Sequence, residues 1–371
     1  MPLRDASSPR EAGIDPGALE RLDRLVESQV GSGCYPGAVV VVARNGLVAH
    51  RRAYGYRSLY PEREEMTLDT LFDAASLTKV AATLPVVLRL AEEGALGLDD
   101  RLSLYYPAFT GGWKDRVTLR HLLTHTSGLP AHRHLYSLLP GPEAVEGYIA
   151  SLDLEYEPGT RVVYSDLGFI LLGKIAERLL GMPLDEAARR LVFEPLGMTD
   201  TMYRPGEAER ARAAATEYVP GTGFLRGVVH DENARFMGGV SGHAGLFTTA
   251  DDLAVYGEAW LEGGSLGGAR ILGGATVAEA VRPQTEGLGE RRGLGWQLRG
   301  PGASCGDFLS MQAFGHTGFT GTSLWVDPVY RLVVVFLTNR VHPTRDNRCL
   351  LRARRLVHNV VAGGILGGAK E

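Results

Sequence analysis

The chain of 371 residues is poor in lysine and contains no long apolar run. Only four residues are lysine, against 35 arginines, and the basic residues are scattered among 43 acidic ones. The net charge is −4, so the sequence has no basic stripe of the kind that binds nucleic acid. No segment approaches the length of a membrane span, and the N-terminus lacks the apolar core of a signal peptide. We therefore expect neither a nucleic-acid nor a membrane partner, and a cytoplasmic location.

The three cysteines, Cys34, Cys305 and Cys349, are odd in number and lie far apart in the sequence. Their spacing does not match that of a metal site, and their number fits a reducing compartment. Hydrophobic residues make up 44% of the chain and charged residues 22%. This composition is typical of a globular, enzyme-sized protein with one large domain or two interleaved ones.

One of the few lysines follows a serine in the segment Asp73-Ala-Ala-Ser76-Leu-Thr-Lys79. Arginine keeps its proton near neutral pH, whereas a lysine removed from water can become a neutral amine that acts as a base. Ser76 opens an apolar stretch that ends at Glu92 and is typical of a buried helix. Residues three apart on a helix share a face, so Ser76 Oγ is expected beside Lys79 Nζ. The pattern indicates an activated serine nucleophile, and the alternative is a serine N-cap followed by a surface lysine.

Two apolar hairpins are predicted near the two ends of the chain. The first joins Gly37–Ala43 to Leu47–Tyr54 through the turn Asn45-Gly46. The second joins Ser323–Asp327 to Leu332–Thr338. Two sets of strands this far apart in the sequence suggest one antiparallel sheet whose two parts meet in space.

Residues 81–224 follow a mostly helical, loop-rich pattern, in which Pro85 should kink the first helix. Strands at both ends and helices in the middle predict an α/β fold of the α+β type. We expect an antiparallel sheet flanked by helices, with an inserted, mostly helical domain. Residues 1–80 and 225–371 would form the α/β domain, residues 81–224 the helical domain, and the active site would lie between them.

Two further polar groups stand next to predicted elements. Tyr164 and Asp166 come directly before the apolar helix Leu167–Ala176, although aspartate is a common N-cap and tyrosine a common core residue. The segment His316-Thr317-Gly318 precedes the second hairpin, and glycines on both sides of the histidine would let a substrate approach the backbone closely. A lone histidine on a strand is more often structural, so each group by itself is weak evidence for a site.

Taken in order, Ser76-x-x-Lys79, Tyr164-x-Asp166 and His316-Thr317-Gly318 resemble the S-x-x-K, Y-x-N and K-T-G motifs of the serine penicillin-recognising enzymes. The resemblance is closest to the branch that holds class C β-lactamases, low-molecular-weight penicillin-binding proteins, D-amino-acid peptidases and family VIII esterases. It covers most of the chain, because residues 117–129, 230–234 and 238–247 are also similar to that branch. The resemblance implies a β-lactamase/transpeptidase-like fold.

The resemblance also implies a role for each matched residue. Ser76 would attack an acyl carbonyl, and Lys79 would take its proton directly or through Tyr164, which would pass it to the leaving group. The backbone N–H groups of Ser76 and Phe319 would form the oxyanion hole. The remaining substrate-binding residues would be Asp166, His316, Thr317 and Gly318. Neither a metal nor an organic cofactor is expected.

Two departures from the motifs bear on the substrate. His316 stands where the family usually has a lysine that helps to receive a substrate carboxylate, and histidine is largely neutral at pH 7. Asp166 stands where the family has an asparagine, so it adds a negative charge close to Lys79. A nearby carboxylate favours the ammonium form, which would make Lys79 a poorer base at rest.

Other patterns in the sequence compete with this interpretation. The segment Gly302-Ala-Ser304-Cys-Gly306 matches the G-x-S-x-G elbow of α/β-hydrolases, but no strand is predicted before it. Four histidines, His121, His125, His132 and His134, lack an acidic partner at zinc-protease spacing and are expected to be structural. Three cleft candidates, His230, Asp231 and His243, receive no chemical role from the sequence.

The sequence therefore predicts a serine hydrolase that forms an acyl-enzyme with a small-molecule ester, amide or peptide substrate. Short esters, D-amino-acid or muropeptide-like peptides and β-lactams all remain open as substrates, and no oligomeric state is predicted. The alternative is a covalent penicillin-binding sensor or a binding module that keeps Ser76 and Lys79 but does not turn over.

Overall fold

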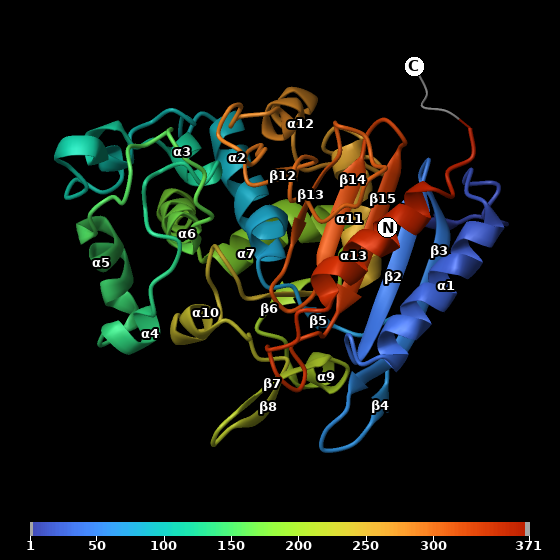
Figure 1. The fold of residues 1–371 in the computed structure, drawn as a ribbon. Helices are drawn as coiled ribbons and strands as arrows, with labels where there is room; N and C mark the ends of the chain where they lie inside the picture. Colours follow the sequence, from blue (N-terminus) through green and yellow to red (C-terminus); the bar gives the residue numbers. More distant parts are fainter. Residues whose placement is uncertain (1–2, 368–371) are drawn as a thin grey trace.

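A large sheet forms the centre of the computed structural model, which describes residues 3–367 (Figure 1). Its strand order is β1-β3-β2-β15-β14-β13-β12, with β4 paired to β3. The pairing of β1 with β3 is parallel and the other pairings are antiparallel. The strands are β1 (Arg4–Asp5), β2 (Gly37–Arg44), β3 (Leu47–Ser58), β4 (Glu64–Glu65), β12 (Gln297–Leu298), β13 (Phe314–Thr317), β14 (Ser323–Asp327) and β15 (Leu332–Thr338).

The predicted hairpins are confirmed as β2–β3 and β14–β15, and the two ends of the chain meet in the middle of the sheet. There β2 pairs with β15, so that Val41 lies opposite Val335. The valines of β2 alternate between two cores, with Val40 and Val42 in one and Val39 and Val41 in the other. A continuous apolar run of this kind is typical of a strand that is covered on both faces.

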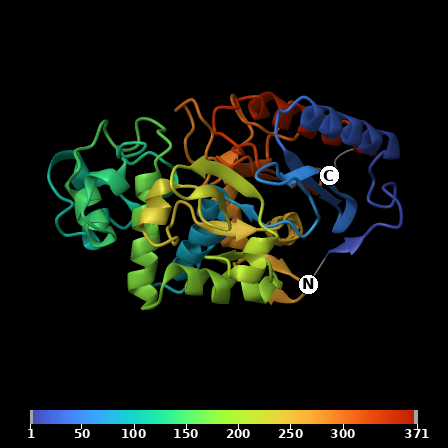
Figure 2. The ribbon, with the colours of Figure 1, turned by 90° about the horizontal axis from the view of Figure 1, so that it is seen from below.

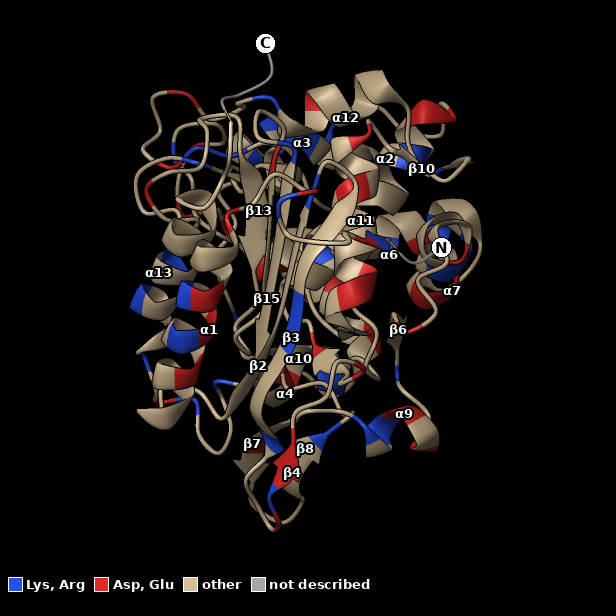
Figure 3. Cartoon of the chain, turned by 90° about the vertical axis from the view of Figure 1, so that its right-hand side faces the viewer, with Lys and Arg blue, Asp and Glu red and all other residues tan. Residues whose placement is uncertain are grey.

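Helices cover both faces of the sheet, as Figure 3 shows. On one face, α1 (Pro16–Gly31) and α13 (Leu350–Ala362) lie side by side (Figure 1, Figure 2). On the other face, α11 (Ala250–Leu261) packs against β2, β14 and β15. The expected sheet flanked by helices is therefore present.

Most of the remaining helices lie in the middle of the sequence, on the left of Figure 1. They are α2 (Leu84–Glu92), α3 (Leu119–Leu123), α4 (Leu135–Leu138), α5 (Val145–Ser151), α6 (Asp166–Leu180), α7 (Leu184–Ala188), α8 (Glu194–Leu196), α9 (Glu207–Ala211), α10 (Glu232–Phe236) and α12 (Gly274–Val281). Short π-helical or 3₁₀ segments are η1 (Lys79–Thr83), η2 (Leu102–Leu104), η3 (Gly112–Arg116), η4 (Pro142–Ala144) and η5 (Arg189–Phe193). Small sheets are formed by β5 (Phe72–Asp73) with β9 (Leu246–Thr248) and β6 (Met202–Tyr203), by β7 (Ala215–Val219) with β8 (Gly223–Arg226), and by β10 (Ser265–Leu266) with β11 (Ala269–Arg270).

The division into domains of residues 1–80 with 225–371 and of residues 81–224 stays a prediction. Strand β8 crosses its boundary, since it spans Gly223–Arg226. Residues 1, 2 and 368–371, which the prediction assigned to the α/β domain, lie outside the described residues.

The helix expected after Ser76 is present, but its first part is π-helical. Segment η1 (Lys79–Thr83) has the wider π geometry, and the regular α-helix begins at Leu84. Pro85 has no N–H to donate to the turn before it, so the α-helical hydrogen-bond ladder is interrupted at this point. Single widened turns of this kind occur often at functional sites.

The cysteines do not behave as the sequence suggested. Cys34 and Cys349 form a disulfide that joins the end of α1 to the start of α13, across a sequence separation of 315 residues. Cys305 is a buried free thiol. The odd number and wide spacing of the cysteines predicted a reducing compartment. The disulfide contradicts this prediction, because cysteines far apart in the sequence can lie side by side in the fold.

Within residues 3–367, none of the helices combines the length and the apolar character needed to cross a membrane.

Candidate active site

Ser76 stands at the end of a turn whose backbone is held from several sides. Ala75, directly before it, has a φ of 46°, which is uncommon for a residue with a side chain. The buried carboxylate of Asp73 accepts hydrogen bonds from the N–H groups of Ala75 (2.8 Å) and His230 (2.6 Å). The Thr322 hydroxyl donates to the carbonyl of Ala74 at 3.0 Å. A non-glycine residue in this conformation persists only when its surroundings fix it, and such residues cluster at active sites.

Lys79 places its amine against the serine hydroxyl. Lys79 Nζ lies 3.0 Å from Ser76 Oγ, 2.8 Å from Asp166 Oδ1 and 3.0 Å from the carbonyl oxygen of His243. These three acceptors match the three N–H bonds of an ammonium group. The lysine is fully buried, whereas Ser76 is partly exposed. The structure therefore brings the predicted nucleophile and base together, with the lysine set to hold a proton at rest.

Asp166 controls the charge of that lysine. Burial by itself would lower the pKa of Lys79, but the negative charge of Asp166 outweighs it and raises the pKa above its usual value. Burial likewise disfavours the charged form of Asp166, yet Lys79 and His132 together hold the pKa of this carboxyl far below its usual range. The expected ion pair between Asp166 and Lys79 is therefore present, and both partners are charged near neutral pH.

Tyr164 lies over the lysine, one residue before the N-cap of α6. Lys79 Nζ lies 4.8 Å from the centre of its ring, and the guanidinium carbon of Arg292 lies 5.3 Å from the same point. Its hydroxyl group is buried and has no hydrogen-bond partner among the described residues. A buried hydroxyl without a partner is costly, so a substrate group or a water molecule is expected to bind to it.

His316 and Thr317 form the end of β13, Gly318 follows directly, and all three border the same cavity. His316 donates a hydrogen bond from Nδ1 to the carbonyl oxygen of Thr317 at 2.9 Å, while Nε2 has no partner in the described structure. Burial, together with the charges of Arg292 and Lys79, holds the pKa of His316 well below its usual range. The histidine is therefore neutral at pH 7, as the sequence suggested.

Gly318 must be a glycine because the chain passes very close to the serine turn. A side-chain carbon at Gly318 would lie 2.4 Å from the carbonyl oxygen of Ala74. The next residue, Phe319, is 49% exposed and borders the cavity. Among the described contacts, neither Ser76 nor Phe319 uses its backbone N–H. Within these contacts both N–H groups are free, as the oxyanion role expected from the family resemblance would require.

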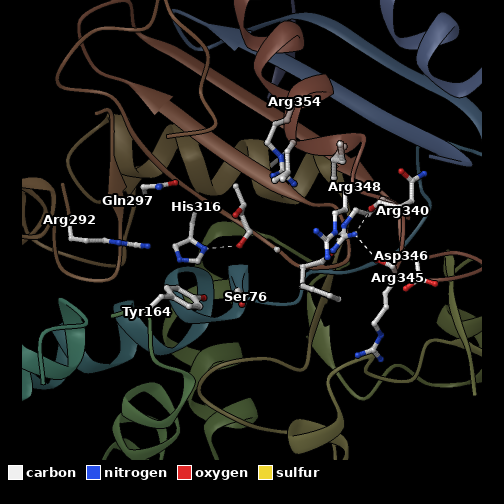
Figure 4. Close-up of a pocket in the computed structure, with 16 residues that line it drawn as sticks. Ser76, Tyr164, Arg292, Gln297, His316, Arg340, Arg345, Asp346, Arg348 and Arg354 are labelled. Atoms are coloured by element: carbon white, nitrogen blue, oxygen red, sulfur yellow. Dashed lines mark hydrogen bonds between the residues drawn. The ribbon is translucent and has the colours of Figure 1, made fainter. Parts of the chain in front are cut away.

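The cavity beside Ser76 has a volume of about 870 Å³. Figure 4 shows Tyr164, His316 and Ser76 along one part of it, with Arg292 and Gln297 at one end and several arginines at the other. Lys79 and Asp166 do not line the cavity but lie behind Ser76 and Tyr164.

Several residues that support the site received no role from the sequence. His132 Nδ1 lies 3.3 Å from Asp166 Oδ2, and Asp166 raises the pKa of this histidine. Asp231 lies 2.8 Å from Nε2 of His243, whose carbonyl accepts from Lys79. These pairs join segments far apart in the sequence, so no local pattern marks them.

The competing patterns do not converge on the cavity. Ser304 lies in an irregular loop and its hydroxyl has no partner among the described residues. His121 caps α3, and His125 Nδ1 accepts from the backbone N–H of Ser165, so both are structural as expected. His132 is the exception, because it contacts Asp166. Across residues 3–367, no group of three or more His, Cys, Asp or Glu side chains is arranged to hold a metal ion.

Comparisons with known proteins agree with this geometry. The model of the family described as Beta-lactamase matches residues 22–359. The chain is 34% identical to a protein of Escherichia coli (strain K12) named a candidate D-alanyl-D-alanine carboxypeptidase, over 93% of this chain and 88% of the relative. It is also 34% identical to the N-acetylmuramyl-L-alanine amidase of Bacillus subtilis (strain 168), over 87% of this chain and 81% of the relative.

Solved structures share the fold. EstCE1, a hydrolase with promiscuous acyltransferase activity, matches 92% of this chain and 98% of its own, with a TM-score of 0.73 and 26% identity. A class C beta-lactamase matches 96% of this chain and 98% of its own, with a TM-score of 0.76 and 22% identity. The chain therefore belongs to the beta-lactamase family and is a serine hydrolase that acts on esters or amides.

Proposed function

We propose that this protein is an amidase that cleaves peptide-containing fragments through an acyl-enzyme on Ser76. The observation that carries the proposal is the 3.0 Å contact between Lys79 Nζ and Ser76 Oγ at the wall of a cavity large enough for a peptide. The two curated relatives support an amide substrate, because one is named for D-alanyl-D-alanine and the other for N-acetylmuramyl-L-alanine.

In the proposed reaction, Lys79 first releases one proton to solvent, and Ser76 Oγ then attacks the carbonyl carbon while the hydroxyl proton moves to Lys79 Nζ. The N–H groups of Ser76 and Phe319 stabilise the oxyanion. Tyr164 passes this proton from Lys79 to the leaving amine as the C–N bond breaks, and the acyl-enzyme remains. Water then attacks the acyl carbonyl and gives one proton through Tyr164 to Lys79, and that proton returns to Ser76 Oγ as the acyl–oxygen bond breaks.

Ester hydrolysis is a second candidate. His316 is neutral where the related motif has a lysine, so this position supplies no cation for a substrate carboxylate. A neutral histidine in the third motif favours short neutral esters as substrates. The structurally similar EstCE1, a hydrolase with promiscuous acyltransferase activity, also supports this candidate.

The test compares one panel of substrates on the wild type and on Ser76→Ala. A 4-nitrophenyl ester, nitrocefin, a peptide ending in D-Ala-D-Ala and N-acetylmuramyl-L-alanine cover the candidates. We expect the highest kcat/KM on one of the two amides, and loss of about 10⁶ in rate on every substrate with Ser76→Ala. A covalent fluorophosphonate adduct on the alanine variant would refute the role of Ser76, and a single burst of nitrophenol without turnover would indicate a sensor.

A further inference from the structure

His132 and Lys79 contact the two oxygen atoms of one carboxylate. Lys79 Nζ lies 2.8 Å from Asp166 Oδ1, and His132 Nδ1 lies 3.3 Å from Asp166 Oδ2. Asp166 therefore links the buried lysine to a histidine. Of the two cations, only the histidine ordinarily changes its charge between pH 5 and 8.

The three side chains lead from the interior of the protein to its surface. The side chain of Lys79 is fully buried, that of Asp166 is 18% exposed and that of His132 is 38% exposed. His132 can therefore exchange a proton with water directly, whereas Lys79 cannot. The charge of His132 follows the pH of the solution, and Asp166 is placed to transmit a change in that charge to Lys79.

The backbone fixes His132 in this position. The residue belongs to the loop between α3 and α4, which is held against the start of α6. The N–H of Asp166 donates to the carbonyl of Ala131 at 3.0 Å, and the hydroxyl of Ser165 donates to the carbonyl of Pro130 at 2.7 Å. The contact between His132 and Asp166 is thus built into the packing of the loop on the helix.

Acidic groups face His132 from two elements. Asp166 is the first residue of α6, and Asp231 and Glu232 lie at the start of α10. The hydrogen bond to Asp166 is the main reason why the pKa of His132 is raised above its usual value, and the other two carboxylates act in the same direction. His132 is therefore charged in mildly acidic solution and loses its charge as the solution becomes alkaline.

The neighbours on the same loop do not cancel this effect. Arg133 pairs with Glu155 at 3.3 Å, so its charge has a partner of its own. The ring centre of His134 lies 5.1 Å from that of His132. The carboxylates of α6 and α10 therefore dominate the surroundings of His132.

A charged His132 makes it easier for Lys79 to release a proton. One carboxylate then faces two cations, and the like charges of the two cations disfavour the ammonium form of Lys79. When His132 is neutral, Asp166 stabilises the ammonium ion alone. The proton balance is closed, because Lys79 gives one proton to solvent while His132 holds one that it took from solvent.

We propose that His132 is a positioning residue for the reaction, whose charged form shares the carboxylate of Asp166 and thereby allows Lys79 to release its proton. The inference rests on the proposed function, in which neutral Lys79 is the base for Ser76. It explains how a lysine held in an ion pair supplies a neutral amine in neutral and mildly acidic solution.

The experiment compares kcat/KM for a neutral 4-nitrophenyl ester at pH 5.5 and at pH 9, with buffer alone as the blank. The ester does not titrate in this range, so changes in kcat/KM belong to the enzyme. His132→Gln should lower kcat/KM about tenfold at pH 5.5, which corresponds to about one unit in the pKa of Lys79. At pH 9 the same variant should stay within about twofold of wild type, because the wild-type histidine is then neutral.

His132→Arg should give the complementary result. Arginine keeps its charge at both pH values, so this variant should match wild type at pH 5.5 and exceed it about tenfold at pH 9. A purely structural role of His132 cannot produce a gain. The matched control is His134→Gln, at an exposed histidine whose Nδ1 contacts the Tyr136 hydroxyl, which should stay within about twofold of wild type at both pH values.

The route through Asp166 is tested in the Asp166→Asn background. There the carboxylate that joins the two cations is gone, so His132→Gln should change kcat/KM by the same factor at pH 5.5 and pH 9. A tenfold difference between the two pH values in this background would overturn the route through Asp166.

In the protein with Asp166 intact, an equal effect of His132→Gln at both pH values would overturn the inference, and so would a His132→Arg variant without a gain at pH 9. Neither result would touch the proposed reaction, because the dependence of ester hydrolysis on Ser76 is measured in the same assay. Turnover by Ser76→Ala at the wild-type rate would instead refute the proposed function.

Discussion

At the scale of single residues, the notable feature of this site is that Lys79, which we propose as the base, is held as an ammonium ion. Lys79 donates to Ser76, to Asp166 and to the carbonyl of His243, and all three contacts are 3.0 Å or shorter. The same contacts that orient the lysine also stabilise its proton. Activity must therefore depend on how easily this proton leaves.

Lys79→Arg should reduce kcat/KM nearly as much as Lys79→Ala, because a guanidinium group keeps its proton at every pH at which the protein is folded. Positive charge alone cannot replace a removable proton. Steady-state kinetics on a 4-nitrophenyl ester checks this, with Lys174→Arg on α6, at a partly exposed lysine outside the cavity lining, as the matched control. An arginine variant within tenfold of wild type would show that Lys79 has only an electrostatic or structural role.

Asp166→Asn should move the acidic limb of the pH profile of kcat/KM to lower pH. The carboxylate raises the pKa of Lys79, so its removal lowers that pKa and leaves more neutral amine at a given acidic pH. The shift expected for an ion pair is roughly one to three pH units. Asp153→Asn, at an exposed aspartate, is the control. Since Asp166 contacts Lys79 directly, a limb that stays in place would mean that Lys79 is not the base.

The contact between Ser76 and Lys79 could be predicted from the sequence, but the surroundings of the two residues could not. Ser76 and Lys79 are three residues apart, so helical geometry alone was enough to pair them. His132, the carbonyl of His243 and the positive φ of Ala75 reach the same place through contacts between distant segments. No spacing in a single sequence encodes such contacts.

At the scale of elements, the strands were easier to predict than the start of the catalytic helix. A continuous apolar run and an Asn-Gly turn defined the first hairpin, and its strands appear as β2 and β3. The residues after Ser76 have the composition of an α-helix, yet η1 is π-helical. Composition does not distinguish α-helical from π-helical hydrogen bonding, because the choice between them depends on the missing N–H of Pro85 and on packing.

The disulfide between Cys34 and Cys349 is an element-scale connection that should contribute measurably to stability. Cys349→Ser is expected to lower the free energy of unfolding by about 2–4 kcal/mol, chiefly because the unfolded chain is no longer closed into a loop. Urea unfolding followed by circular dichroism measures it. The control is Cys305→Ser, in which the disulfide remains and a reducing agent should still shift the midpoint. Wild-type protein with the same midpoint with and without dithiothreitol would contradict the prediction.

At the scale of the whole molecule, stability depends on the strand pairing that joins the two ends of the chain. Leu337 on β15 is fully buried and lies opposite Val39 on β2. Leu337→Ala should therefore cost about 2–5 kcal/mol in the free energy of unfolding. The same change at the 67% exposed Leu104 should cost less than about 0.5 kcal/mol. Equal effects of the two substitutions, measured by urea unfolding, would show that β2 and β15 do not pair as described.

The overall architecture followed from the order of elements, because strands at both ends of a chain have few ways to bury their apolar residues except in one sheet. The cavity could not be predicted from the order of elements. The arginines that line it come from the loop before β12, from the segment after β15 and from α13. Arginine is so common in this sequence that its positions did not indicate a cavity.

The pairing of β2 with β15 also has a consequence for synthesis on the ribosome. Ser76 and Lys79 are made before β13, which carries His316, and before Phe319, which follows that strand. Since synthesis proceeds from the N-terminus at roughly 5–20 residues per second, the nucleophile waits many seconds for the rest of its site. We therefore expect a growing chain that ends before β13 to lack the proposed oxyanion hole, and its Ser76 to stay unreactive toward acylating compounds until β13, β14 and β15 have joined β2.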